Sequence, residues 1–105
     1  MANGITAAAL QAEAAQLTLV DVRRVAARDA SPEAIPGASW RDPERVGEWA
    51  ADLPAGRRIV VYCVHGHEVS QGVADALVAS GHEARYLDGG IVGWVVAGGP
   101  VTGKA

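Results

Sequence analysis

The sequence predicts an α/β fold in which a central parallel sheet carries helices on both faces. Short apolar stretches alternate along the chain with helix-forming stretches, as is typical of parallel sheets with right-handed crossovers. The clearest unit is a β-branched strand over 59–62, a polar loop that starts at Cys63, and a helix over 69–80 closed by Gly81. Ligands of such sheets bind outside the carboxyl ends of the strands, so Cys63 lies where a site is expected.

The composition fits one domain that spans residues 1–105. A chain of 105 residues can bury a core but is too short for two domains. The net charge of −3 gives no basic footprint, so neither nucleic acid nor an anionic membrane is expected as a partner. No apolar run approaches the roughly 20 residues that a spanning helix needs, and the start of the chain lacks a secretion signal. The single cysteine excludes an internal disulfide and favours a reducing compartment, with the cytoplasm as the expected location.

The other elements are predicted from caps, turn residues and apolar runs. Before the central strand we expect a helix capped by Thr6 over 7–15, a buried strand over 17–22, a short helix or turn over 23–28, a loop over 29–37, a brief strand over 38–40 and a helix from Asp42 to about Ala51. After Gly81 we expect a strand over 83–87, a turn over 88–90, a short helix over 91–97 that carries Trp94, and a tail over 101–105.

Cys63 is a candidate nucleophile because of its place in this pattern. A strand that runs into a loop and then a helix aims several backbone N–H groups at one point, and the helix dipole adds positive potential there. A thiol at the first position of such a loop is placed to ionise, because its thiolate is the anion that the loop would bind. A lone cysteine is more often a small buried hydrophobe, but its position at the strand end favours a nucleophile.

Four segments together resemble a single-domain rhodanese. They are, in chain order, Leu19-Val20-Asp21-Val22-Arg23, Ile35-Pro36-Gly37-Ala38, Val61-Tyr62-Cys63 followed by Gly66, and Leu87-Asp88-Gly89-Gly90-Ile91-Val92-Gly93-Trp94. The resemblance runs from about Leu17 to Pro100, and its specificity lies in the order and spacing of the four. The His-Gly-His-Glu run is also similar to rhodanese-like proteins associated with heavy-metal and chromate resistance.

The resemblance implies a sulfurtransferase that needs no cofactor. Cys63 would take a sulfane sulfur from a small-molecule donor, hold it as a persulfide and pass it to cyanide or a thiol; a protein is a further candidate acceptor. Asp21 and Arg23 would tie loops together near the active face. The loop would surround the persulfide anion with main-chain N–H groups, and Gly66 allows a backbone angle that other residues resist. The loop and substrate-binding residues are Val64, His65, Gly66, His67, Glu68, Val69 and Ser70.

Glu68 departs from the pattern of the family. Many members that use thiosulfate carry a basic residue at this position, and a carboxylate repels an anionic donor. The alternative is that Glu68 is an acidic residue at a helix start, which is favourable by a few tenths to about 1 kcal/mol. The two interpretations are compatible, and both make thiosulfate a doubtful physiological donor.

His65 and His67 form a Cys-x-His-x-His array with Cys63. Such an array invites a metal site, but three ligands on one tight loop rarely converge without a fourth from elsewhere, so no metal is predicted. The two imidazoles either shape the donor pocket, where they would lower the thiol pKa or move a proton, or lie on the rim in solvent.

Two other functions compete with sulfur transfer. A cysteine phosphatase or arsenate reductase needs an arginine that closes the loop on an oxyanion, whereas positions 68 to 70 are Glu, Val and Ser. A non-catalytic thiol sensor or sulfur carrier that docks to a partner stays open. Outside the loop, His82 is expected at the surface, and Trp40 and Trp49 as a lid or a core pair.

Overall fold

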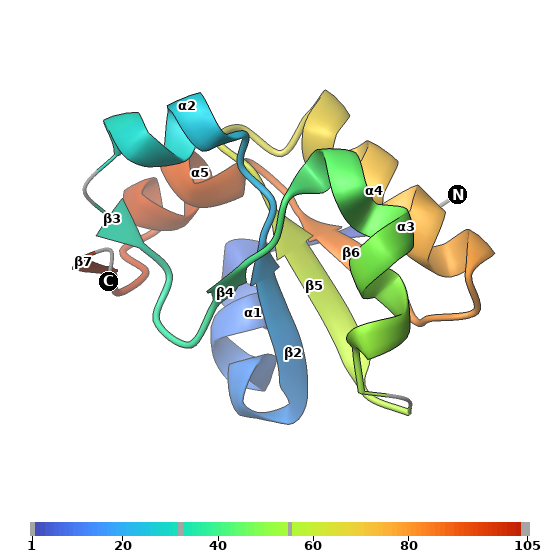
Figure 1. Cartoon of the computed structure of the whole chain (residues 1–105). Coiled ribbons are helices and arrows are strands. Elements are labelled where there is room, and N and C mark those ends of the chain that lie inside the picture. Colours follow the sequence, from blue (N-terminus) through green and yellow to red (C-terminus); the bar gives the residue numbers. More distant parts are fainter. Residues whose placement is uncertain (1, 32, 55, 104–105) are drawn as a thin grey trace.

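A five-stranded parallel sheet forms the centre of the protein in a computed structural model that describes residues 2–31, 33–54 and 56–103 (Figure 1). Its strand order is β1-β6-β5-β2-β4, so the central strand β5 has neighbours on both sides. The sheet strands are β1 (Asn3–Ile5), β2 (Leu17–Asp21), β4 (Ser39–Trp40), β5 (Arg58–Tyr62) and β6 (Ala84–Leu87). This confirms the predicted α/β class with a central parallel sheet.

Helices cover both faces of the sheet, and each face buries its own apolar cluster. The helices are α1 (Ala7–Glu13), α2 (Val25–Ala30), α3 (Val46–Trp49), α4 (Glu68–Ala79) and α5 (Gly90–Val96), with 3-10 turns η1 (Ala14–Gln16), η2 (Pro43–Arg45) and η3 (Ala50–Asp52). Side chains of β5 alternate between the faces because the period of a strand is two residues. Val61 therefore packs with α3 and α4, whereas Val60 and Tyr62 pack with α1 and α5.

Three short strands were not predicted. β1 pairs in parallel with β6 at the sheet edge, although Asn3 and Gly4 have low strand propensity. β3 (Glu33–Ala34) lies in the segment expected as a loop and pairs antiparallel with β7 (Thr102–Gly103), which lies in the expected tail. These strands form only because they pair with segments that are distant in sequence. Parts of that loop and tail, residues 32 and 104–105, lie outside the described residues.

Three side chains outside the site can be compared with their predicted positions. His82 is a partly exposed side chain that lines surface hollows, which agrees with its prediction as a surface residue, and its Nε2 lies 2.9 Å from the Ala50 carbonyl oxygen. Trp49 belongs to the core, while Trp40 is half-buried and stacks under the Arg28 guanidinium, 5.4 Å from the ring centroid. The two tryptophans therefore do not form a core pair. Each helix in the described part of the chain is too short or too polar to cross a bilayer.

Candidate active site

Cys63 follows the last residue of β5, at the carboxyl edge of the sheet. In Figure 1 the loop after β5 lies at this edge, close to α2 and α5 and leading into α4. Cys63 is 6% exposed and borders an open hollow of about 230 Å³. The hollow is lined by Arg23, Arg24, Ala27, Cys63, Val64, His65, His67, Glu68 and Val69. The hollow thus brings together most residues predicted for the site, with Cys63 in its wall, whereas Asp21, Gly66 and Ser70 do not line it.

The carbonyl groups of the loop are tied to α5 and α4. The Cys63 and Val64 oxygens accept the amides of Ile91 at 3.0 Å and Val92 at 3.1 Å. The side-chain amide of Gln71 donates to the Gly66 oxygen at 3.0 Å, and its backbone N–H donates to the His67 oxygen at 3.0 Å. These hydrogen bonds hold the loop through its carbonyl groups, from α5 and α4.

The N–H groups of the same peptides have no partner among the described residues. Backbone N–H groups from Val64 to Ser70 donate no hydrogen bond to any other described residue. In a trans peptide the C=O and the next N–H point in opposite directions, and no described peptide bond is cis. Because the Cys63 and Val64 carbonyls face α5, the Val64 and His65 N–H groups face away from it. A run of free N–H groups that leads into the first turn of a helix is suited to binding an anion.

Two glycines let the loop pack directly against the turn before α5. Gly66 has a φ of +73°, and a Cβ at this position would lie 2.6 Å from the Leu87 oxygen and 2.7 Å from the Gly89 nitrogen. Gly90, with a φ of +59°, would place a Cβ 2.4 Å from the Val64 oxygen. Both positions therefore need glycine for backbone angle and for space. The turn over 88–90 therefore packs against the loop and holds it.

Ser70 is fully buried on the first turn of α4 and lies against the cysteine. The Cys63 thiol donates to its hydroxyl, with 3.1 Å between Sγ and Oγ. The hydroxyl can rotate to donate to sulfur when the sulfur carries a negative charge. Glu68, Val69 and Ser70 belong to α4 rather than to the loop, so the helix begins one residue earlier than predicted and its positive end lies at the site.

Asp21 and Arg23 form a buried ion pair at the end of the neighbouring strand β2. The Arg23 Nη2 lies 2.7 Å from one Asp21 oxygen, and Nε lies 3.1 Å from both. Burial opposes the charge on Arg23, but the hydrogen bonds and negative charge of Asp21 raise its pKa above the ordinary value. Nη1 is buried without a hydrogen-bond partner among the described residues. The pair stiffens the segment that leads into α2, and Arg23 forms part of the wall of the hollow.

Tyr62 extends this buried network under the site. Its hydroxyl accepts the amide of Ile35 at 3.2 Å, and the Arg23 guanidinium lies 5.8 Å from its ring centroid. Burial, together with the negative charge of Asp21, raises the pKa of Tyr62 to about 12. The ring is therefore neutral at physiological pH and acts as a structural support.

His65 and His67 are exposed on the rim of the hollow. Their ring centroids lie 6.1 Å apart with a tilt of 31° between the planes. Across the residues that the structure describes, no three His, Cys, Asp or Glu side chains are gathered as metal ligands. The two imidazoles therefore lie on the rim, whereas Cys63 is buried in the wall of the hollow.

Sequence reasoning missed Arg24 and Gln71. Arg24 precedes α2 and lines the hollow opposite the loop, and Gln71 holds two of the loop carbonyls. The Arg23-Arg24 pair directly after a strand was a usable signal for Arg24. Gln71 had none, because its function depends on how the loop folds back over the first turn of α4.

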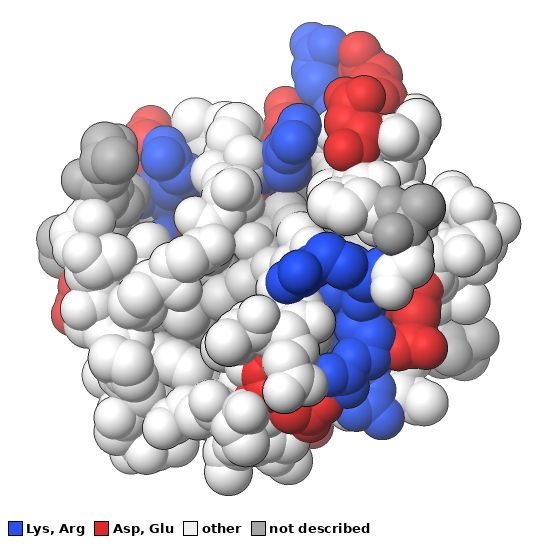
Figure 2. All heavy atoms as spheres, turned by 90° about the horizontal axis from the view of Figure 1, so that it is seen from below, with Lys and Arg blue, Asp and Glu red and all other residues white. Residues whose placement is uncertain are grey.

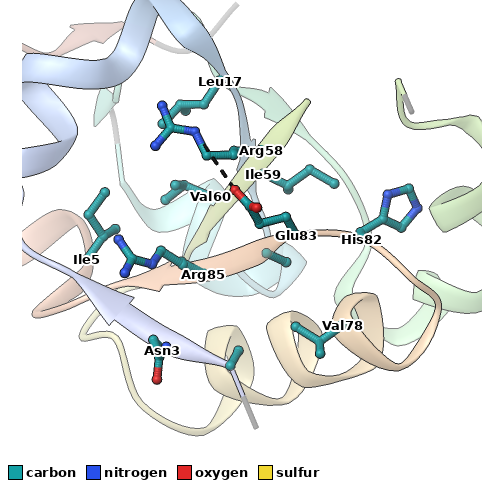
Figure 3. A pocket seen from close by; sticks show the side chains of 12 residues that line it. Asn3, Ile5, Leu17, Arg58, Ile59, Val60, Val78, His82, Glu83 and Arg85 are labelled. Atoms are coloured by element: carbon teal, nitrogen blue, oxygen red, sulfur yellow. Dashed lines mark ion pairs between the residues drawn. The ribbon is translucent and has the colours of Figure 1, made fainter. Parts of the chain in front are cut away.

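A larger hollow of about 550 Å³ lies at the opposite, amino-terminal edge of the sheet (Figure 3). Here Arg58 points towards Glu83, 4.0 Å away, and also pairs with Glu13. Figure 2 views the molecule from below, and basic side chains there lie beside acidic ones. The residues lining this hollow include no cysteine. The charge of Arg58 is already paired with the carboxylates of Glu13 and Glu83. The chemistry of the molecule is therefore expected at Cys63.

Comparison with known proteins agrees with this geometry. Residues 6–97 match the rhodanese-like domain. A rhodanese-related protein from Thermoplasma volcanium superposes with a TM-score of 0.84 at 25% identity, over 95% of this chain and 97% of that one. A thiosulfate sulfurtransferase from Pseudomonas aeruginosa superposes with a TM-score of 0.83 at 24% identity, over 98% of this chain and 20% of that one.

A third solved structure, from Rhodopseudomonas palustris, is described as a protein of unknown function and possible tyrosine phosphatase. It superposes with a TM-score of 0.82 at 22% identity, over 96% of this chain and 85% of that one. Likeness at this level of identity shows the shared fold alone. The match over residues 6–97 covers most of the sequence, and the chain belongs to the rhodanese-like domain family.

Proposed function

We propose that the protein, acting as one domain over residues 1–105 in a reducing compartment such as the cytoplasm, is a sulfurtransferase that carries sulfane sulfur on Cys63. The observation that carries this proposal is the run of unpaired backbone N–H groups from Val64 to Ser70 around the only cysteine. A persulfide anion is large and polarisable, and several weak donors stabilise it without a fixed counter-charge. The hydroxyl of Ser70 adds a further donor next to the sulfur.

Sulfur transfer at this site is a pair of displacements without net oxidation. The Cys63 thiolate attacks the outer sulfur of the donor, so a new S–S bond forms while the bond between that sulfur and the donor breaks. The electron pair of the broken bond leaves with the donor. A thiol or cyanide then attacks the outer sulfur of the Cys63 persulfide, and the thiolate is regenerated. The free N–H groups would hold the negative charge between the two steps.

Phosphate or arsenate chemistry fits this site less well. A phosphatase of this kind needs a guanidinium that closes the loop and clamps the oxyanion with two hydrogen bonds. The loop and the first turn of α4 carry Glu68 instead, and the buried Arg23 is paired with Asp21. A carboxylate at the mouth repels a tetrahedral dianion, which favours sulfur transfer.

The test is sulfur loading followed by turnover. The protein is incubated with thiosulfate, cysteine persulfide or glutathione persulfide, and its intact mass is measured. We expect a gain of one sulfur that cyanide removes and that Cys63→Ser abolishes. Loading without turnover to an acceptor would indicate a sulfur carrier or thiol sensor instead of an enzyme. Absence of loading from every donor would refute the proposal.

A further inference from the structure

Two unpaired side chains of opposite charge flank the hollow in which Cys63 lies. Arg24 is the residue before α2, and Glu68 is the first residue of α4. Both are exposed and both line the hollow. Among the described residues neither forms a hydrogen bond or an ion pair through its side chain, either with the other or with a third group.

Other charged side chains near the sheet have carboxylate partners. Arg58 at the opposite edge has two carboxylate partners, and the buried Arg23 is paired with Asp21. Arg24 and Glu68 instead keep their hydrogen-bonding capacity for a molecule that enters from solvent. The two charges come from different elements and line the same hollow as Cys63, without pairing with each other.

We infer that the sulfur donor is the persulfide of an amino-acid-type thiol, a small zwitterion that carries both a carboxylate and an ammonium group. Its carboxylate binds the guanidinium of Arg24, which presents planar paired donors suited to that group. Its ammonium group binds the carboxylate of Glu68. The inference rests on the proposed sulfurtransferase function and adds the substrate class and two specificity-determining residues.

The same pair of charges disfavours the simplest alternative donors. Thiosulfate is a dianion, so it gains from Arg24 but is repelled by Glu68. A persulfide that carries only a carboxylate or only an ammonium group satisfies one side chain and leaves the other unpaired. A zwitterion is the class that meets both charges at once.

The transfer step balances without an added oxidant. The Cys63 thiolate attacks the terminal sulfur of the donor R–S–SH, an S–S bond forms to Cys63, and the S–S bond of the donor breaks. The leaving thiolate R–S⁻ takes the proton of the new persulfide group. The products are the thiol R–SH and the persulfide anion on Cys63.

Three donors that differ in a single group test the inference on the full chain. They are the persulfides of cysteine, of 3-mercaptopropionate, which lacks the ammonium group, and of cysteamine, which lacks the carboxylate. The KM and kcat of sulfur loading on Cys63 are measured for wild type, Arg24→Ala and Glu68→Gln. Arg85→Ala and Glu33→Gln are matched controls, since both side chains are exposed and lie away from the loop.

We expect wild type to show the lowest KM with cysteine persulfide. Arg24→Ala should raise KM about three- to fivefold for cysteine and mercaptopropionate persulfides, as is typical of a solvent-facing ion pair, and lower it for cysteamine persulfide, whose ammonium group the guanidinium repels. Glu68→Gln should raise KM for the two donors with an ammonium group and lower it for mercaptopropionate persulfide. The controls should match wild type.

Two results overturn the inference, and they are distinct from failure of the proposed function. If the variants shift KM equally for all three donors, or for none, Arg24 and Glu68 do not read the charged groups. If wild type gains no sulfur from any donor by intact mass, sulfur transfer itself is refuted, and the substrate class is refuted with it.

Discussion

The change Gly66→Ala tests whether the loop depends on direct backbone contact with the turn before α5. The φ of +73° at this position disfavours alanine by about 1–2 kcal/mol, partly offset by about 0.4–1 kcal/mol from a less flexible unfolded chain. The added methyl group would lie 2.6 Å, 2.7 Å and 2.9 Å from three backbone atoms of Leu87, Gly89 and Gly90. Overpacking of this kind costs a further ~1–3 kcal/mol. We expect a loss of about 2–4 kcal/mol in the free energy of unfolding.

Gly37→Ala is the matched control. Gly37 has a φ of +85°, but a Cβ there would meet nothing within 4 Å, so it carries the backbone penalty alone. Urea unfolding should therefore show Gly66→Ala to be less stable than Gly37→Ala by about 1–3 kcal/mol. Gly66→Ala should also lose sulfur loading under conditions in which it is still folded. Equal stability of the two variants, with loading retained, would refute the contact as a determinant of the loop.

Two further predictions concern charge. Glu68→Arg should raise the rate of sulfur loading from thiosulfate, because it replaces repulsion by attraction at the mouth, whereas Glu33→Arg should not; a rate that is unchanged or lower at several salt concentrations would count against this. The second concerns the pKa of Tyr62, which burial and the charge of Asp21 raise from 10.0 to about 12. The unfolded chain releases this proton first, so stability should be complete below pH 10 and fall by about 2–3 kcal/mol between pH 10 and 12. Urea titrations of Tyr62→Phe should lack this loss, while Tyr86→Phe should keep it.

The central unit of the fold was predictable because its signals are local. The β-branched run before Cys63 and the glycine at position 81 mark a strand and a helix end without reference to any other segment. β1 was missed because Asn3 and Gly4 form a strand only beside β6.

The candidate site was predictable to a similar extent. The loop around Cys63 and the buried partners Asp21 and Arg23 lie where the sequence placed them, at one edge of the sheet. Arg24 was missed because its importance depends on α2 lying across the hollow from α4, which no local pattern encodes. The hydrogen bonds from α5 to the loop carbonyls were also missed, because they depend on how two distant segments of the chain pack together.

The two amides of α5 that hold the loop have a consequence for the order in which the molecule can assemble. Ile91 and Val92 are nearly thirty positions after the carbonyls that they bind, and they follow every strand of the main sheet in the chain. A growing chain can therefore form β2 and β5 before it can shape the loop around its sulfur. The thiol should stay chemically ordinary until the last helix docks, so reactivity would report completion of the fold.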